Sequence, residues 1–444
     1  MTCAYIIRKI DKDLLDWSKE QDHKPLLIRG ARQVGKSSSV RKLAENFDYF
    51  VEVNFEKNTT AHIFFDFDLI PQEICAKLSV HFNIPIIPNK TLLFFDEIQA
   101  CPRAISALRF FYEDYPELHV VAAGSLLEFA LEELPSFGVG RIRSLYMYPF
   151  SFSEFMNACG ERLLWNEICN SSPEKPLFPA FHHKALELLK KFLVVGGMPA
   201  VVSKFVESQD ILSSQYILND LIDSLKADFS KYKNRVPELR ISTAFQAIVE
   251  QTGNKFNYSK VEPYNIRQIK ESIELLQKAG LVISIVHTSA SGIPLGAQVN
   301  HKKQKFITLD TGIFQRLLGL ELSDILFGNN FSVINKGFIA EQMVGLELLK
   351  SSPSYDQGQL YYWQREVEKS HAEVDYVVQQ GESIIPIEVK SGTTGKMQSL
   401  HLFMNEKKSE YGVRTSLENF VQYDKIKVFP LYAIGNFRKI NNNQ

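Results

Sequence analysis

Cysteine is scarce in this sequence, and the few cysteines present are not arranged as pairs. The 444 residues contain five, at positions 3, 75, 101, 159 and 169, with no Cys-x-x-Cys motif and no neighbouring histidine cluster. These observations exclude a disulfide-stabilised scaffold and a zinc site of the usual ligand spacing, and they predict reduced thiols.

Long apolar runs and low-complexity domains are missing as well. No segment approaches the roughly 18 uninterrupted apolar residues that a membrane helix needs, and the first ten residues lack the apolar region of a secretion signal. The sequence also contains no internal repeat. We therefore expect a cytoplasmic protein with no membrane partner.

An excess of charge of either sign is also absent, because 50 Lys and Arg residues face 51 Asp and Glu residues, a net charge of −1. Any contact with nucleic acid therefore has to be local. The 45% of hydrophobic and 23% of charged residues are ordinary for globular proteins. Since single cores stop growing at roughly 250 to 300 residues, the length predicts two to four domains.

The pattern of apolar residues divides the chain into four parts. Residues 1–155 alternate short buried-strand patterns with helical ones, which predicts a parallel sheet covered by helices on both faces. Residues 156–225 have helical spacing, broken by Gly-Gly-Met-Pro at 196–199. Residues 226–320 give two helices and then two strands, an order that predicts a winged helix. Residues 321–444 return to an α/β pattern.

A complete phosphate-binding motif follows the first predicted strand. It consists of Gly30, Ala31, Arg32, Gln33, Val34, Gly35, Lys36 and Ser37, and it opens a predicted helix. The glycines let backbone N–H groups surround a phosphate chain at a helix N-terminus, where the helix dipole favours anions. We expect Lys36 to neutralise the β- and γ-phosphates of a nucleotide and Ser37 to bind its Mg²⁺.

Polar residues end two further strand patterns. Asp96 and Glu97 follow an apolar run; we expect Asp96 to hold the Mg²⁺ shell and Glu97 to polarise the water that attacks the γ-phosphate. Ser125 ends another run, and it is either a polar sensor of the γ-phosphate or part of a small-residue turn. Arg141 and Arg143 are candidates for an arginine that reaches the phosphate of a neighbouring subunit, or alternatively for surface ion pairs.

Two longer motifs accompany these residues. Asp-Glu-Ile-Gln stands at 96–99 and Tyr-Pro-Phe-Ser-Phe-Ser-Glu-Phe at 148–155. With the phosphate loop and the break at 196–199, the chain resembles the bacterial and archaeal AAA-type ATPases that carry a C-terminal restriction-endonuclease-like domain of unknown function. The resemblance implies a P-loop ATPase domain, a helical lid, and ATP and Mg²⁺ as cofactors of ATP hydrolysis. Ser125 departs from it, because many AAA-type enzymes have Asn there.

The last part of the chain contains a second group of charged residues. Asp375 lies in a strand pattern, Glu388 and Lys390 share one face of another, and Glu341 lies in a preceding helix. This spacing resembles the core of PD-(D/E)XK nucleases, in which the three acids would hold a metal ion and the lysine would help to activate water or steady a charged phosphate. The alternative is a nuclease fold that only binds DNA or a protein partner.

The predicted winged helix carries a local positive charge. Residues 226–310 contain 13 Lys and Arg against 7 Asp and Glu. Arg267 and Lys270 lie on the second helix, with Lys278 close by, and Lys302, Lys303 and Lys305 lie where a wing would begin. Such residues would contact DNA phosphates, although winged helices also mediate protein contacts.

Three hypotheses for function remain open at the level of the sequence. The first is a Mg²⁺-dependent ATPase that couples its nucleotide state to a DNA-facing winged helix and a nuclease-like domain. A homo-oligomer is a candidate assembly for such an ATPase. The second is an ATP-dependent switch whose C-terminal domain is catalytically silent. The third is a small-molecule kinase, which the Glu after Asp96 and the additional domains disfavour.

Overall fold

The computed structural model describes residues 5–133, 138, 140–232, 236–320, 337–367, 372–392 and 397–440. The chain divides into two compact units. The first comprises residues 1–149, 278–280 and 353–357, and the second comprises residues 150–277, 281–352 and 358–444. Within the described residues, no helix combines the length and the apolar character that crossing a bilayer demands.

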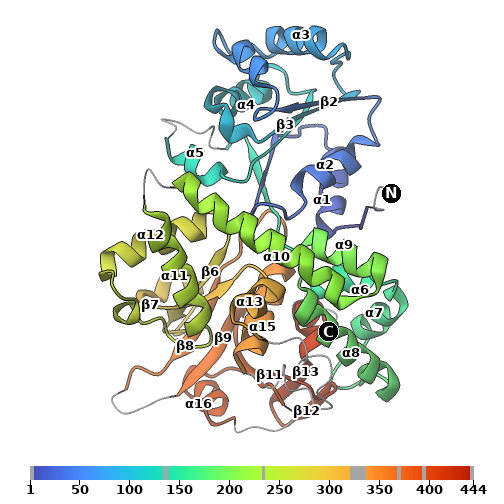
Figure 1. Cartoon of the computed structure of the whole chain (residues 1–444). Helices are drawn as coiled ribbons and strands as arrows, with labels where there is room; N and C mark the ends of the chain where they lie inside the picture. Colours follow the sequence, from blue (N-terminus) through green and yellow to red (C-terminus); the bar gives the residue numbers. More distant parts are fainter. Residues whose placement is uncertain are drawn as a thin grey trace. The chain divides into compact units, whose positions relative to one another are not determined.

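The first unit is built on a five-stranded sheet in the order β2-β3-β4-β1-β5, and all of its strand pairs are parallel (Figure 1). This confirms the predicted parallel sheet. Its strands are β1 (Leu26–Arg29), β2 (Tyr49–Asn54), β3 (Thr91–Asp96), β4 (His119–Ala123) and β5 (Arg143–Tyr146). Its helices are α1 (Lys9–Trp17), α2 (Lys36–Ala44), α3 (Pro71–Phe82), α4 (Pro102–Asp114) and α5 (Leu127–Glu133), with 3₁₀ helices at η1 (Thr59–Phe65) and η2 (Ile98–Ala100).

The strands of the first unit are buried because helices pack against them. Every residue of β3 and β4 is buried, which is why these strands read as continuous apolar runs. Leu93 and Phe95 of β3 pack with Ile74 of α3 and Leu108 of α4 in one hydrophobic core. Burial of this apolar face fixes the register of the sheet, and so the edge at which the polar residues that end β1, β3 and β4 meet.

The second unit begins with helices and continues into an eight-stranded sheet. The helices are α6 (Phe152–Ala158), α7 (Arg162–Cys169), α8 (Pro179–Val195), α9 (Pro199–Ser208), α10 (Ile211–Ala227), α11 (Glu238–Gln251), α12 (Ile266–Lys278), α13 (Thr311–Leu317), α15 (Gly337–Ser351), α16 (Gln398–Lys407) and α17 (Phe437–Ile440). Four 3₁₀ turns accompany them among the described residues: η3 (Asp228–Tyr232), η4 (Tyr258–Lys260), η5 (Leu295–Gln298) and η6 (Leu431–Asn436).

The described part of that sheet has the order β12-β13-β11-β10-β9-β8-β6-β7. Its strands are β6 (Val282–Thr288), β7 (Val299–Thr308), β8 (Leu360–Gln364), β9 (Glu373–Gln380), β10 (Ser383–Val389), β11 (Gly412–Ser416), β12 (Val421–Tyr423) and β13 (Ile426–Pro430). Since β6 pairs with β8, the hairpin of the predicted winged helix and the strands of the last part of the chain belong to one sheet.

Helices α15 and α16 both pack against strands of that sheet. Trp363 of β8 and Val374 of β9 pack with Phe403 of α16 in one core cluster, so Trp363 is a core residue rather than a surface aromatic. Tyr376 of β9 instead meets Gly345 of α15, where an added Cβ would lie 2.4 Å from the tyrosine oxygen. Val374 and Tyr376 would face the same side of a regular strand, so their packing against different helices requires a distortion, which the ladder irregularity between Tyr361 and Trp363 marks.

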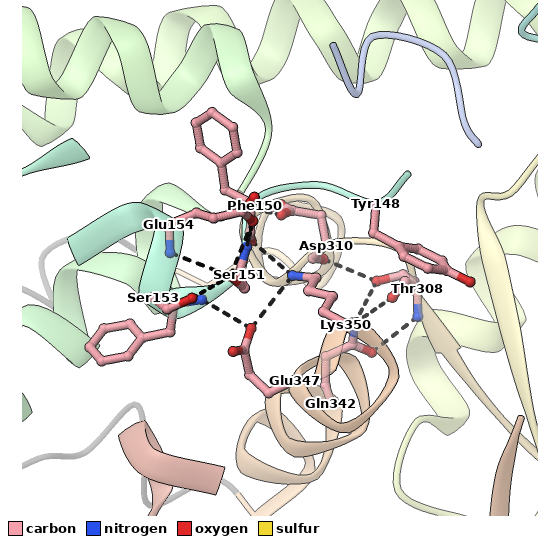
Figure 2. Close-up of polar contacts among 12 residues, drawn as sticks. Tyr148, Phe150, Ser151, Ser153, Glu154, Thr308, Asp310, Gln342, Glu347 and Lys350 are labelled. Carbon is pink, nitrogen blue, oxygen red and sulfur yellow. Dashed lines mark hydrogen bonds and ion pairs between the residues drawn. The ribbon is translucent and has the colours of Figure 1, made fainter. Parts of the chain in front are cut away.

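A buried polar network joins the start of the second unit to its sheet (Figure 2). Lys350 of α15 donates to the carbonyl of Phe150 at 2.9 Å, and Glu347 accepts from the backbone N–H of Phe152 at 3.1 Å. Asp310 accepts from the N–H of Gly197 at 2.6 Å. The motif at 148–155 and the glycine break at 196–199 therefore supply backbone groups to buried charged side chains.

Candidate nucleotide-binding site and C-terminal acidic cluster

The predicted phosphate loop connects the end of β1 to the start of α2. Gly30 and Gly35 have φ values of +143° and +100°, which residues with a side chain rarely adopt. A Cβ at Gly30 would also lie 2.1 Å from the carbonyl oxygen of Met147. Because α2 starts at Lys36, the unsatisfied N–H groups of its first turn lie at the loop, as an anion site requires.

Lys36 is buried in this loop, with 7% of the residue exposed. Its Nζ donates to the carbonyl oxygens of Gly30 and Ala31, both at 2.8 Å. Burial lowers the pKa of the Lys36 ammonium to about 8, against the opposing effect of Glu97 and Asp96. The loop thus holds a lysine whose charge is costly until further anionic groups approach it.

Ser37 and Asp96 lie together beside the loop. The Ser37 hydroxyl donates to Asp96 Oδ1 at 2.9 Å, and Asn54 Nδ2 donates to Asp96 Oδ2 at 3.0 Å. Burial raises the pKa of Asp96, and the Ser37 hydrogen bond opposes this shift. A hydroxyl and a carboxylate are hard oxygen ligands, so this pair fits the Mg²⁺ of a nucleotide. Asn54 was missed in the sequence, although it ends β2 directly opposite Asp96.

Glu97 follows Asp96 in a left-handed backbone conformation, with φ 48° and ψ 44°. Its Oε2 accepts from Gln99 Nε2 at 2.7 Å, from the Ser125 N–H at 3.3 Å and from the Ser125 hydroxyl at 3.2 Å. The structure therefore brings Ser125 to Glu97. Gln99 was not assigned a role from the sequence, and a Cβ at Gly124 would lie 2.0 Å from its Oε1.

The two candidate arginines lie in ion pairs of the first unit. Arg141 pairs with Glu113 of α4, and Arg143 Nη1 lies 2.7 Å from Glu20 Oε1. Arg143 stands opposite Leu26, the first residue of β1, whereas the phosphate loop follows the last residue of that strand. The prediction that an arginine reaches a neighbouring subunit stays a prediction.

The C-terminal candidates come from α15, β9 and the end of β10. The structure gives Glu388 and Lys390 a direct contact, with 2.6 Å between Oε1 and Nζ. Asp375 Oδ2 accepts from the backbone N–H of Val389 at 2.8 Å. Glu341 instead pairs with Lys305 of β7 at 2.9 Å. Among the described residues, no group of three or more His, Cys, Asp or Glu is arranged to hold a metal ion.

Lys305 is the residue whose role the sequence misrepresented. It stands in a run of basic residues and was expected to contact phosphate, but its side chain is 1% exposed. Lys303, two residues earlier, is partly exposed and pairs with Glu366 at 2.6 Å. Arg267 on α12 has a side chain that is 90% exposed, with Glu271 as its ion-pair partner at 3.3 Å. The burial pattern of β7, half-buried or exposed before Lys305 and buried from Lys305 onward, separates these basic residues.

Family models match three stretches of the chain. Residues 22–156 match an AAA domain, residues 186–324 a domain of unknown function (DUF8612), and residues 336–434 another domain of unknown function (DUF4143). The first match contains the phosphate loop, the acids that end β3, and all five parallel strands. This part of the chain is therefore an AAA-type P-loop domain.

Solved structures resemble the chain only distantly. A Walker-type ATPase of Pyrococcus abyssi has 14% identity and a TM-score of 0.46, and the alignment covers 71% of this chain and 96% of that chain. The Aeropyrum pernix Orc1 protein in complex with DNA has 13% identity and a TM-score of 0.28, with 70% and 90% covered. Among curated proteins, none matches the chain.

Proposed function

We propose that the first unit binds ATP with Mg²⁺ and hydrolyses it. The observation that carries the proposal is the convergence of Lys36, Ser37, Asp96 and Glu97 at one edge of a parallel sheet, inside the stretch that matches an AAA domain. In open α/β sheets, ligands bind outside the carboxyl ends of the strands, which is where these residues lie.

Each residue has a role that follows from its contacts. The backbone N–H groups of the loop and of the first turn of α2 bind the phosphates, and Lys36 exchanges its two carbonyl contacts for phosphate oxygens. Ser37 and Asp96 would hold Mg²⁺, which supplies a positive charge to the phosphates. This assignment needs no side chain from outside the first unit.

Glu97 is the group proposed to orient and deprotonate the attacking water. Its carboxylate accepts hydrogen bonds from Gln99 and Ser125. Ser125 therefore fixes the position of the Glu97 carboxylate, in addition to any contact that it makes with phosphate.

Phosphate release by purified Glu97→Gln protein tests the assignment. The variant keeps the size of the side chain and removes its basicity, so we expect unchanged Mg-ATP affinity and a turnover at least 100-fold lower. Turnover equal to that of the unaltered protein would exclude Glu97 as the base. Release of phosphate without a phosphorylated acceptor also separates hydrolysis from a kinase reaction.

We further propose that the second unit contacts DNA through a surface formed by α12 and the start of β7. The supporting observation is the exposure of Arg267 on α12 and of Lys302, which precedes the buried part of β7. Neutralised phosphates release counterions, so binding should weaken steeply with salt. If an Arg267→Ala, Lys302→Ala variant binds DNA as tightly as the unaltered protein does, this surface is excluded.

We also propose that the chain assembles as a homo-oligomer, with Arg141 reaching a neighbouring subunit.

A further inference from the structure

Lys305 carries a buried positive charge in the middle of the second unit. Its Nζ lies 2.9 Å from Glu341 Oε1 and 2.5 Å from Glu373 Oε1. The ring of Tyr362 lies 5.3 Å from the same atom. Lys305 comes from β7, Glu341 from α15 and Glu373 from β9, so three elements distant in the sequence meet around one ammonium group.

Asp375 belongs to the same acidic cluster. Burial lowers the pKa of Lys305, but the negative charges of Glu341, Asp375 and Glu373 outweigh burial and raise it, so the ammonium stays charged. Burial raises the pKa of Glu341 to about 8, and burial followed by Asp375 raises that of Glu388 to about 7.

A divalent cation does not fit this arrangement. Mg²⁺ requires a near-octahedral set of oxygen atoms at about 2.0–2.1 Å. Glu341 faces Lys305, Asp375 accepts from Val389, and Glu388 contacts Lys390. Among the described acids of this cluster, Glu388 contributes the one fully buried oxygen without a hydrogen-bond partner, its Oε2, and one oxygen does not make a metal site. A metal ion would also be repelled by the buried ammonium.

We propose that the Lys305 ammonium is the resident cation of this cluster and takes the position that a divalent metal would otherwise need. The cluster then ties β7, α15 and β9 together, and the C-terminal domain lacks the metal on which nuclease chemistry of this kind depends. This inference is independent of ATP hydrolysis in the first unit. It favours a C-terminal domain that binds its partner without cleaving it.

Mn²⁺ titration of the nucleotide-free full-length protein tests the proposal, with the bound ion counted by electron paramagnetic resonance. Asp375→Asn provides the matched control, because the amide keeps the size and the acceptor for Val389. We expect the unaltered protein and Asp375→Asn to bind the same number of Mn²⁺ ions. We expect Lys305→Met to bind one more, and the added site to disappear in a Lys305→Met, Asp375→Asn double variant.

Two results would overturn the proposal. One is a Mn²⁺ site in the unaltered protein that Asp375→Asn removes. The other is a folded Lys305→Met protein that gains no site, because Lys305 would then not be what excludes the metal. If circular dichroism shows that Lys305→Met does not fold, the comparison of the unaltered protein with Asp375→Asn decides alone. Mg-ATP affinity, measured in parallel, shows whether the first unit is intact.

Discussion

The pH dependence of ATP affinity follows from the burial of Lys36. The free protein holds this ammonium with a pKa of about 8, whereas bound phosphates favour its charged form. Above pH 8 the free protein has lost the proton and must take one up when ATP binds. Affinity should therefore be constant below pH 8 and fall about tenfold for each further pH unit, or about 1.4 kcal/mol per unit.

Calorimetric titration with a non-hydrolysable ATP analogue and Mg²⁺, from pH 7 to pH 9.5, measures this slope. Lys36→Arg is the matched control, because its guanidinium stays charged over the whole range. We expect the control to bind more weakly but with no slope. An affinity that does not change with pH in the unaltered protein would refute the reasoning, and so would a control with the same slope.

Two further predictions concern other parts of the chain. Ser125→Ala removes the hydroxyl that donates to Glu97 and should change kcat about fivefold with little effect on KM, corresponding to about 1 kcal/mol for one hydrogen bond; steady-state kinetics would show no change if Ser125 only completes a turn. Asp310→Ala leaves the buried N–H groups of Gly197 and Ile313 without their acceptor and should lower the free energy of unfolding by about 2–4 kcal/mol in urea titrations. Asp310→Asn should cost less, and equal losses in both variants would contradict this explanation.

The sequence was most informative where local pattern and chemistry coincide. The buried runs of β3 and β4 and the glycines of the phosphate loop each have one local cause, so the parallel sheet and the position of the loop follow from them. The contact of Ser125 with Glu97 was not predicted, since it depends on a hydrogen bond between the ends of two neighbouring strands.

Lys305 shows why the rest could not be predicted. In the sequence it belongs to a run of basic residues, and local spacing favours a solvated position. Its burial depends on Glu341 and Glu373, which lie 36 and 68 positions further along the chain and reach it only when α15 and β9 pack beside β7. Pairing at that separation is a property of the tertiary structure, and one sequence does not contain a local pattern for it.

Calorimetry of Mg-ATP binding to the intact chain tests the central claim most directly. We expect binding at a stoichiometry of one per chain, dependent on Mg²⁺ and abolished by Lys36→Ala, because the loop then lacks the charge that faces the phosphates. Absence of nucleotide binding by the folded, unaltered protein would contradict the account, as would full binding by Lys36→Ala.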